Sequence, residues 1–397
     1  RGLGDVYKRQ DQRIEALKER FVRKFKEEAT DVFSSPGRIE LLGNHTDHNN
    51  GKVLVSTIDL NILAVASKRD DNRVVFYSKG FPKMTVTLSR LKLHENEYGT
   101  SVALIRGVLF KMKQLGYKIG GFNVVSDSTI FKGAGVSSSA AFEILIGKII
   151  SYYYNEDSIA AFKLAQIGQF AESVYFNKPC GLLDQSGIAL GGINYIDFKY
   201  LVEPVIKNIK VKIPGYQFLL INTGDDHSKL TPCYAAIKDE MAMVSHYFGQ
   251  KVLREVDEEE FYKHIDEVEK KTSHRAVLRA THYFEENKRV ARAYEALTVN
   301  DFKTFFKMMD ESGLSSYNNL QNCYVESEEE KLPQALKFVK TLKGEIYSRV
   351  HGGGFAGTML VVIADKDFEE NYNILVEKYG KNNVMRVALT ENGTCHL

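Results

Sequence analysis

Cysteine is scarce in this sequence, and the residues that occur are far apart. Cys180, Cys233, Cys323 and Cys395 form no Cys-x-x-Cys pair, so their spacing argues against a zinc ribbon and against a disulfide framework. Long apolar runs are also lacking. No segment approaches the ~20 residues that a membrane span needs, and no secretory leader stands near the start. We therefore expect a cytoplasmic protein with no membrane partner.

An excess of one charge is missing as well. The 53 Lys and Arg residues and the 51 Asp and Glu residues leave a formal net charge of +2, and the two signs are interleaved along the chain. This balance gives no electrostatic case for a nucleic-acid partner. The remaining composition, 44% hydrophobic and 26% charged, is that of an ordinary globular protein. We expect a small-molecule partner and a monomer.

A glycine turn, a serine cluster and the start of a helix follow one another at residues 133–140, Gly-Ala-Gly-Val-Ser-Ser-Ser-Ala. Glycine lets backbone N–H groups approach an anion, a helix N-terminus adds partial positive charge, and serine hydroxyls bind phosphate oxygens or a divalent metal. No Gly-Lys-Ser or Gly-Lys-Thr closes the segment, so it is not a Walker A loop. Taken alone, the segment is equally consistent with an N-capped helix after a glycine turn.

Helix and strand signals are mixed along the chain. Apolar residues at helical spacing predict an amphipathic helix around residues 14–25, and residues 1–10 are left out of the fold prediction because the first residue is Arg rather than Met. A chain of 397 residues suits two domains with a site between them, which we place at 11–200 and 201–397, and the mixture predicts an α+β fold. Strands are expected at 59–67, 73–78, 122–125, 193–198, 217–222, 344–350, 358–364 and 384–389, helices at 101–115, 140–154 and 158–176, and a helix-rich stretch at 233–338.

Four segments, in this order, resemble the galactokinases of the GHMP small-molecule kinase superfamily. They are the polar segment at 35–48, the glycine-serine loop, Cys-Gly-Leu-Leu-Asp-Gln at 180–185, and Arg-Val-His-Gly-Gly-Gly-Phe-Ala-Gly at 349–357. The resemblance extends from about Gln12 to near the C-terminus, and four ordered motifs are far more specific than any one. It implies a two-domain GHMP-kinase-like fold with the active site in the cleft between the domains. It also implies phosphorylation of galactose at the C1 hydroxyl, with ATP and Mg2+ as cofactors.

The resemblance assigns catalytic and metal-binding roles. Asp184 matches the proton acceptor that faces the anomeric hydroxyl of the sugar, and Arg38 matches the arginine beside it, which would keep the carboxylate ionised. Ser139 and Glu172 match the magnesium ligands. From the residues alone, a purely structural Arg38–Asp184 salt bridge and a solvent-exposed helix face for Glu172 stay open. Nucleotide binding is implied for Gly133, Ala134, Gly135, Val136, Ser137, Ser138 and Ser139.

Sugar binding is implied for Glu40, Asn44, His45, Thr46, Asp47, Gly181 and Tyr234. Galactokinases usually carry Asn at the position of Glu40 and an acidic residue at that of Asn44. In an extended segment these two side chains would point to one side, so we expect that a carboxylate and an amide have changed places and that Glu40 takes over part of the acidic contact. Galactose is the expected substrate, and N-acetylgalactosamine, arabinose and galacturonate are alternatives.

Other functions compete with this interpretation. His45, Asp47 and His48 could form a metal cluster. The run at 352–357 fits the dinucleotide pattern Gly-x-Gly-x-x-Gly, but a strand rather than a helix is expected after it, and a plain glycine-rich hairpin turn is the remaining alternative. Mevalonate and homoserine kinases of the same superfamily lack the polar segment. A catalytically silent sugar and ATP sensor of this fold is less favoured, because such sensors tend to lose pieces of the phosphate loop that are present here.

Overall fold

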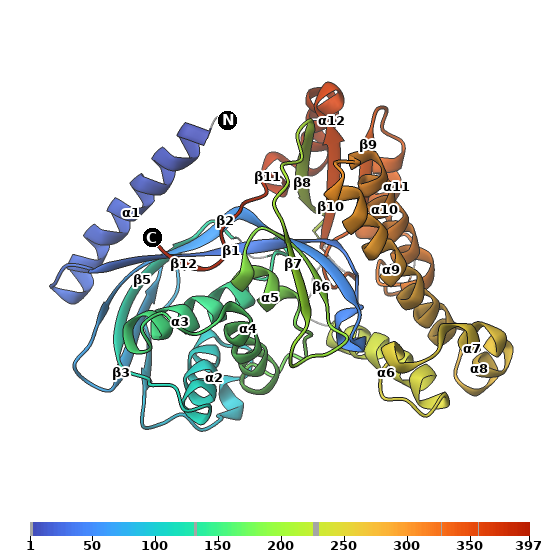
Figure 1. Cartoon of the computed structure of the whole chain (residues 1–397). Helices are drawn as coiled ribbons and strands as arrows, with labels where there is room; N and C mark the ends of the chain where they lie inside the picture. The colour runs from blue at the N-terminus through green and yellow to red at the C-terminus, as the bar shows by residue number, and fades with distance from the viewer. Residues whose placement is uncertain (1–2, 131–132, 225–229, 327, 356) are drawn as a thin grey trace.

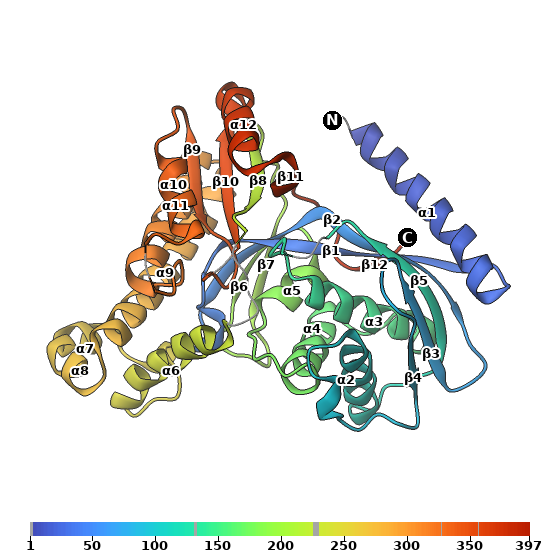
Figure 2. The same cartoon turned by 180° about the vertical axis from the view of Figure 1, so that it is seen from behind.

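The computed structural model describes residues 3–130, 133–224, 230–326, 328–355 and 357–397. It contains two β-sheets, each flanked by helices (Figure 1). Ala356, which belongs to the expected glycine run, lies outside the described residues. Each sheet and its helices form one half of the molecule. The view from behind shows that the two halves meet where β1 and β2 run toward β8 and β10 (Figure 2).

The first sheet has the strand order β12-β1-β2-β5-β3-β4, and β6, which also pairs with β7, lies beside β2. The second sheet has the order β11-β8-β10-β9. The strands are β1 (Asp31–Leu42), β2 (Lys52–Lys68), β3 (Arg73–Ser78), β4 (Met84–Thr87), β5 (Phe122–Ser128), β6 (Ile193–Asp197), β7 (Val205–Ile209), β8 (Tyr216–Asn222), β9 (Ile346–Val350), β10 (Thr358–Ala364), β11 (Val384–Val387) and β12 (Cys395–His396).

Helices cover both faces of the first sheet and both faces of the second (Figure 1). A π turn, Ala171–Tyr175, follows α4, and a second one, Ser316–Leu320, follows α10. The helices are α1 (Leu3–Phe25), α2 (Ser101–Gln114), α3 (Ser138–Tyr154), α4 (Ala161–Phe170), α5 (Leu183–Leu190), α6 (Thr231–Tyr247), α7 (Glu258–Lys263), α8 (Ile265–Lys271), α9 (His274–Thr298), α10 (Phe302–Ser315), α11 (Lys331–Lys340) and α12 (Asp365–Tyr379).

Alternation along the strands divides the core between the faces of each sheet. In β2, Leu63 and Val65 face α1, whereas Ala64 and Ala66 belong to the main core on the other face. In β8, Phe218 and Leu220 belong to that same main core, while the alternate residues pack with α11 and α12. Side chains on a strand alternate between faces, so each sheet turns one of its faces toward this main core. The main core therefore joins the two sheets.

The end of the chain returns to the first sheet. Cys395 and His396 pair with β1 in antiparallel register, His396 opposite Phe33. The His396 ring lies within hydrogen-bond distance of Asp31 and stacks on Tyr152 with 4.0 Å between ring centroids. The first sheet is therefore completed by residues from the far end of the sequence.

Most predicted elements are present, with several shifted ends. The strands 73–78 and 358–364 have their predicted bounds, but β2 begins at Lys52 rather than at residue 59. The single helix expected at 158–176 is α4 followed by a π turn, and α1 includes residues that we had left out. The first sheet continues to Ile209, past the proposed division at residue 200.

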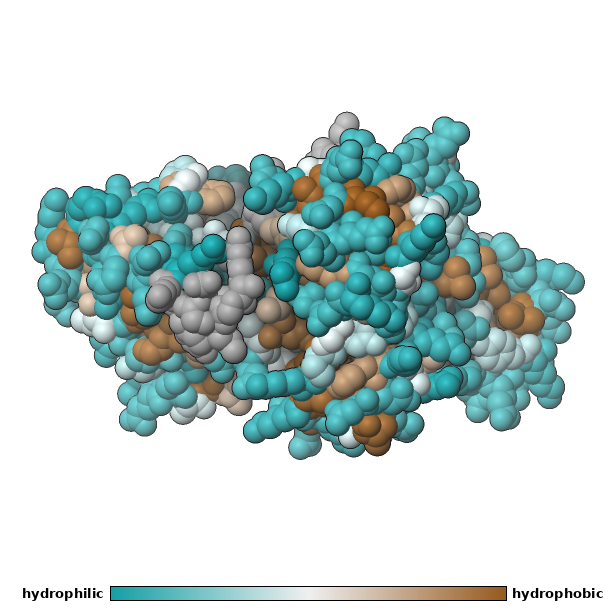
Figure 3. Space-filling model, turned by 90° about the horizontal axis from the view of Figure 1, so that it is seen from above, coloured by the Kyte–Doolittle hydropathy of each residue, from teal (hydrophilic) through white to brown (hydrophobic). Residues whose placement is uncertain are grey.

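The surface seen from above is mostly hydrophilic, with hydrophobic residues in small separate patches (Figure 3). Among the residues described, no helix combines the length and apolar character that crossing a bilayer requires.

Candidate active site

Arg38 and Asp184 meet between β1 and the first turn of α5. Arg38 is 4% exposed, and its Nε donates to Asp184 Oδ1 at 2.6 Å while NH1 donates to the carbonyl of Gly135 at 3.0 Å. The Asp184 side chain is 31% exposed, so solvent reaches it. Burial by itself would raise the pKa of Asp184, but Arg38 and a hydrogen bond from Ser137 outweigh it and hold the pKa below its ordinary value. An ionised carboxylate therefore faces the site.

The glycine-serine loop is held from two sides. The N–H of Arg38 donates to the carbonyl of Val136, and Thr358 Oγ1, at the start of β10, donates to the carbonyl of Gly133 at 3.0 Å. Gly133 and Gly135 have φ of 85° and 70°, a backbone region that glycine adopts freely. The side chains of Ala134 and Val136 are buried, so these two residues offer the site their backbone alone.

Ser139 and Glu172 are brought together, as the sequence led us to expect. Ser139 Oγ donates a hydrogen bond to Glu172 Oε1, and Gln185 donates to Oε2 at 2.9 Å. Glu172 is only 3% exposed, so the alternative of a solvent-exposed helix face is wrong. Adjacent hydroxyl and carboxylate groups are hard oxygen ligands of the kind Mg2+ takes, and this pair therefore fits a magnesium ion.

A second carboxyl group, Glu143 of α3, lies behind this pair. Gln185 Nε2 donates to Glu143 Oε2 at 3.3 Å, and Glu143 Oε1 is buried without a hydrogen-bond partner. Burial, reinforced by the charge of Glu172, raises the pKa of Glu143 well above its ordinary value. Burial and the neighbouring charge of Glu172 therefore favour the uncharged form of Glu143 more than they would for an exposed carboxyl group.

Asp47 lies against Gly181 next to this cluster. Its Oδ2 accepts the N–H of Leu183 at 3.1 Å, and a Cβ on Gly181 would lie 1.9 Å from that same oxygen. Burial, and then the charge of Asp184, raise the pKa of Asp47 to about 6. Asp47 and Asp184 are therefore close enough to influence each other's ionisation.

Two further candidates of the polar segment at 35–48, His45 and Thr46, occupy a tight turn after β1. The Thr46 hydroxyl donates within the turn, to the carbonyls of Gly43 and Lys52 at 3.0 and 2.7 Å. His45 Nε2 lies 2.9 Å from the carbonyl of Gly353. In the described residues no three His, Cys, Asp or Glu side chains are grouped to hold a metal, and Asp47 is engaged with α5, so the alternative of a metal cluster in this segment finds no support.

Tyr234 reaches the site from α6. Its hydroxyl donates to the carbonyl of Gly354 at 3.0 Å, and its ring packs edge-on against Phe355. A Cβ on Gly353 would lie 2.6 Å from the ring. The glycine run joins β9 to β10, and its carbonyl groups bind Tyr234 and His45. Because a strand and not a helix follows the run, the dinucleotide interpretation is wrong. Side chains from both halves of the chain meet here.

Glu40 and Asn44 lie side by side but face the second half of the molecule. Asn44 Nδ2 donates to Glu40 Oε1 at 2.9 Å and to the carbonyl of Gly352 at 2.8 Å. Arg349 NH2 donates to the same Glu40 oxygen at 3.0 Å. Asn44 Oδ1 accepts from Ser316 and Asn322. The expected proximity of the two residues is present although the segment turns at Gly43, and their polar groups are engaged by protein.

Two residues of α9 that the sequence analysis missed hold this turn. Glu286 Oε2 accepts the N–H groups of Gly43 and Asn44 at 3.3 and 3.2 Å, and His282 Nε2 lies 2.9 Å from the carbonyl of Asn44. Burial opposes ionisation of Glu286, but Arg289 and other partners lower its pKa to about 2. Glu286 stands beside an identical residue, Glu285, on a long charged helix, so nothing local in the sequence distinguishes it.

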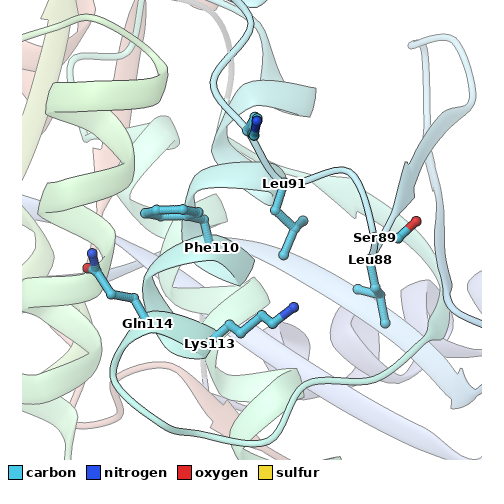
Figure 4. Close-up of a pocket in the computed structure, with 7 residues that line it drawn as sticks. Leu88, Ser89, Leu91, Phe110, Lys113 and Gln114 are labelled. Atoms are coloured by element: carbon cyan, nitrogen blue, oxygen red, sulfur yellow. The ribbon is translucent and has the colours of Figure 1, made fainter.

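A pocket of about 360 Å³ lies between the segment after β4 and helix α2 (Figure 4). The labelled side chains come from both elements, Leu88, Ser89 and Leu91 from the segment after β4 and Phe110, Lys113 and Gln114 from α2. The lining of the pocket is Leu88, Ser89, Leu91, Lys92, Phe110, Lys113 and Gln114. These are outside the set of candidate site residues, so the pocket is separate from the cluster described above.

Comparison with known proteins places this geometry in context. A family model of the galactokinase galactose-binding signature matches residues 19–68, and one of the GHMP kinase N-terminal domain matches residues 103–192. A galactokinase of Clostridium tetani is 28% identical over 93% of this chain and 94% of its own length. A galactokinase of Thermotoga neapolitana is 29% identical over 85% of this chain and 90% of its own.

Solved structures give the same picture for the fold. The structure of Lactococcus lactis galactokinase complexed with galactose has a TM-score of 0.84 at 24% identity and covers 97% of this chain and 100% of that one. A mevalonate kinase structure has a TM-score of 0.62 at 17% identity, over 91% of this chain and 100% of its own. The chain therefore has the two-domain fold that these kinases share.

Proposed function

Because the chain belongs to the galactokinases of the GHMP kinase superfamily, we propose that it transfers the γ-phosphoryl group of ATP to the C1 hydroxyl of galactose, giving galactose 1-phosphate and ADP. One observation carries the proposal. A solvent-accessible carboxylate, Asp184, is kept ionised by a buried arginine, Arg38, directly beside a glycine-serine loop. A proton acceptor and an anion-binding loop in contact are what phosphoryl transfer to a hydroxyl requires.

In this proposal Asp184 accepts the proton of the C1 hydroxyl. The sugar oxygen then forms its bond to the γ-phosphorus as the bond from that phosphorus to the leaving oxygen of ADP breaks. Arg38 holds Asp184 Oδ1 and is itself fixed through Gly135, so its charge is in place before the reaction begins. Pre-organised charge of this kind stabilises a transition state without reorganisation. The loop at 133–139 binds the nucleotide phosphates through backbone N–H groups and serine hydroxyls.

We propose that the sugar is bound by His45, Asp47, Gly181 and Tyr234. The first three lie around Asp184 and the glycine run, and Tyr234 closes the site from the second half of the chain. Thr46, Glu40 and Asn44 belong to the same segment, but they are buried, unlike His45, Asp47 and Tyr234, and their polar groups bind protein atoms. Their proposed contribution is to shape the turn that presents His45 and Asp47. A turn fixed in this way can discriminate between sugars, since misplaced ligand groups lose hydrogen bonds.

Ser139 and Glu172 are the proposed magnesium ligands. When bound, the ion neutralises charge on the phosphate oxygens. Replacing Ser139 by Ala removes one hard ligand while Gln185 still holds Glu172, so the magnesium concentration for half-maximal rate should rise about tenfold. The measurement is a magnesium titration of the initial rate at saturating ATP and sugar. An unchanged requirement would place the ion on other ligands.

The test of the function is ADP release by the purified protein with Mg-ATP and a panel of galactose, N-acetylgalactosamine, glucose, arabinose, galacturonate and mevalonate. Turnover confined to galactose is the expected result. Turnover on another sugar would retain the reaction and change the substrate. Binding of galactose and ATP without any ADP release would instead identify a catalytically silent sensor.

A further inference from the structure

Ser137 of the phosphate loop faces Asp184 and not the helix that it precedes. It occupies the N-cap position of α3, where a serine side chain usually accepts a hydrogen bond from the first turn, but here it makes no capping bond. Its Oγ donates instead to Asp184 Oδ2 at 2.5 Å. The side chain of Ser137 therefore does not cap helix α3.

The backbone conformation of Ser137 also indicates a functional position. Its φ of 61° and ψ of 60° lie in the left-handed region, which is unfavourable for every residue with a Cβ and open to glycine. Strain of this kind points to functional positions when it is observed. The hydroxyl is what serine has and glycine lacks, and in this structure that hydroxyl is bonded to Asp184. The strained conformation thus places an oxygen donor where a glycine would place none.

Ser137 completes a three-point connection between the loop and the base. Arg38 donates to the carbonyls of Val136 and Gly135 from its N–H and its NH1, and it binds Asp184 Oδ1. Ser137 binds the other oxygen of the same carboxylate. Rotation of the carboxylate is thereby restricted, and one lone pair of Oδ2 remains available for a substrate hydroxyl.

We propose that Ser137 is a positioning residue for Asp184, which sets the orientation of the carboxylate and couples it to the loop that binds the nucleotide. This role rests on the proposed function, in which Asp184 accepts the proton of the sugar. Binding of phosphates to the loop then fixes Ser137 and, through it, the base. The loop acts on both reaction partners.

Several charged groups share the surroundings of Asp184, and they enter the expected pH dependence. Arg38 of β1 and Lys178 of the segment before α5 favour the ionised carboxylate, whereas its charge interacts unfavourably with Asp47 and Glu143. The Ser137 hydroxyl donates to the ionised form and so favours it. Removing that hydroxyl should move the acid limb of the rate profile to higher pH, because the four charged or titratable neighbours of Asp184 stay in place and only the hydrogen bond is lost.

The experiment compares Ser137→Gly, Ser137→Ala and Ser137→Thr with the parent chain in kcat and in KM for ATP and galactose, from pH 5 to 9. Glycine removes the hydroxyl and relieves the backbone, so this variant is expected to fold. We expect the Gly and Ala variants to lose roughly ten- to a hundredfold in kcat, the range for a hydrogen bond to a charged group, and to show an acid limb at higher pH. The Thr variant keeps the hydroxyl and should keep the parent acid limb.

Ser138→Ala is the matched comparison, because Ser138 is exposed in the same loop and its change should raise KM for ATP without moving the acid limb. An unmoved acid limb in Ser137→Gly, with only KM for ATP raised, would overturn the proposal and make Ser137 a phosphate ligand alone. Absence of turnover in the parent would refute the proposed function separately. The Asp184 carboxyl titration, followed by carbon-13 NMR in parent and Ser137→Gly, then decides, and equal titrations would overturn the coupling.

Discussion

Asp184 binds protein through both oxygens, so the choice of substitution matters. Asp184→Ala leaves the buried Arg38 without its counter-charge, whereas Asp184→Asn keeps the shape and removes the proton acceptor. We expect Asp184→Asn to lose about a hundred- to ten-thousandfold in kcat and to keep its affinity for ATP within about threefold. ADP release and calorimetric titration with ATP measure the two quantities. Full activity in either variant would remove Asp184 as the base.

Gly181 has a steric reason to be glycine. Its Cβ would lie 1.9 Å from Asp47 Oδ2, so Gly181→Ala must push the Asp47 carboxylate away from Leu183. We expect KM for galactose to rise about tenfold or more, since hydrogen bonds to the sugar are lost, while KM for ATP changes little. Steady-state kinetics with each substrate varied in turn provide the check. An equal rise of both constants would mean that the whole of α5 had shifted.

The residues inside the four motifs, and Glu172 between them, could be predicted from the resemblance, whereas the partners that packing alone brings to them could not. Arg38, Asp184, Ser139 and Glu172 meet in the two pairs that the resemblance implied. Glu286 accepts the N–H of Gly43, in the polar segment, from 243 positions away along the chain. Its burial depends on how α9 packs, and no local spacing encodes that contact. The exchange of a carboxylate and an amide at positions 40 and 44 could be seen in the sequence. That both side chains face the second half of the molecule could not.

Helix α9 ties the turn after β1 to the second half of the molecule, because Glu286 accepts the N–H groups of Gly43 and Asn44. The pKa of Glu286 is about 2, below its usual 4.5, so its ionised form stabilises the fold above about pH 4.5, and that contribution is lost as pH falls toward 2. Glu286→Gln should lower the free energy of unfolding by about 3 kcal/mol at pH 7, and by progressively less below pH 4.5. Urea unfolding at several pH values measures both effects.

Glu285→Gln is the matched control for this prediction. Glu285 precedes Glu286 on the same helix, and its side chain is 42% exposed beside Arg289. An exposed pair of this kind contributes about 1 kcal/mol or less, so the control should be nearly as stable as the parent. Equal losses in the two variants would show that the charge of the helix, and not the turn amides, is responsible.

Strands were predictable where β-branched, aromatic or other apolar residues follow one another without a break, as they do in β3 and β10. The beginning of β2 is less distinct, because Lys52 and Ser56 interrupt its apolar pattern and its burial comes from pairing with β6. The π turn after α4 gave no signal either. It inserts a wider turn that carries Glu172 toward Ser139, and helical periodicity alone would have continued the helix.

The two sheets are joined by a polar cluster of Glu40, Asn44 and Arg349. Glu40→Asn leaves Arg349 buried without a carboxylate, and Asn44→Glu places a second carboxylate beside the first and against the carbonyl of Gly352. Removing one partner of a buried ion pair costs about 3–5 kcal/mol. The double exchange restores one carboxylate and one amide, so it should retain more activity and a higher unfolding midpoint than either single change. A double variant that is worse than both would contradict this account.

The return of the chain end to β1 also has a consequence for synthesis. Ser34 and Phe33 gain their neighbours on this edge only when Cys395 and His396 are present, and the N–H of Leu397 adds a bond to the carbonyl of Val32. While the ribosome is still translating the preceding residues, β1 therefore has an open edge of unpaired backbone groups, the kind of edge at which nascent chains associate. The strand that carries Arg38 is thus synthesised long before the residues that close its edge.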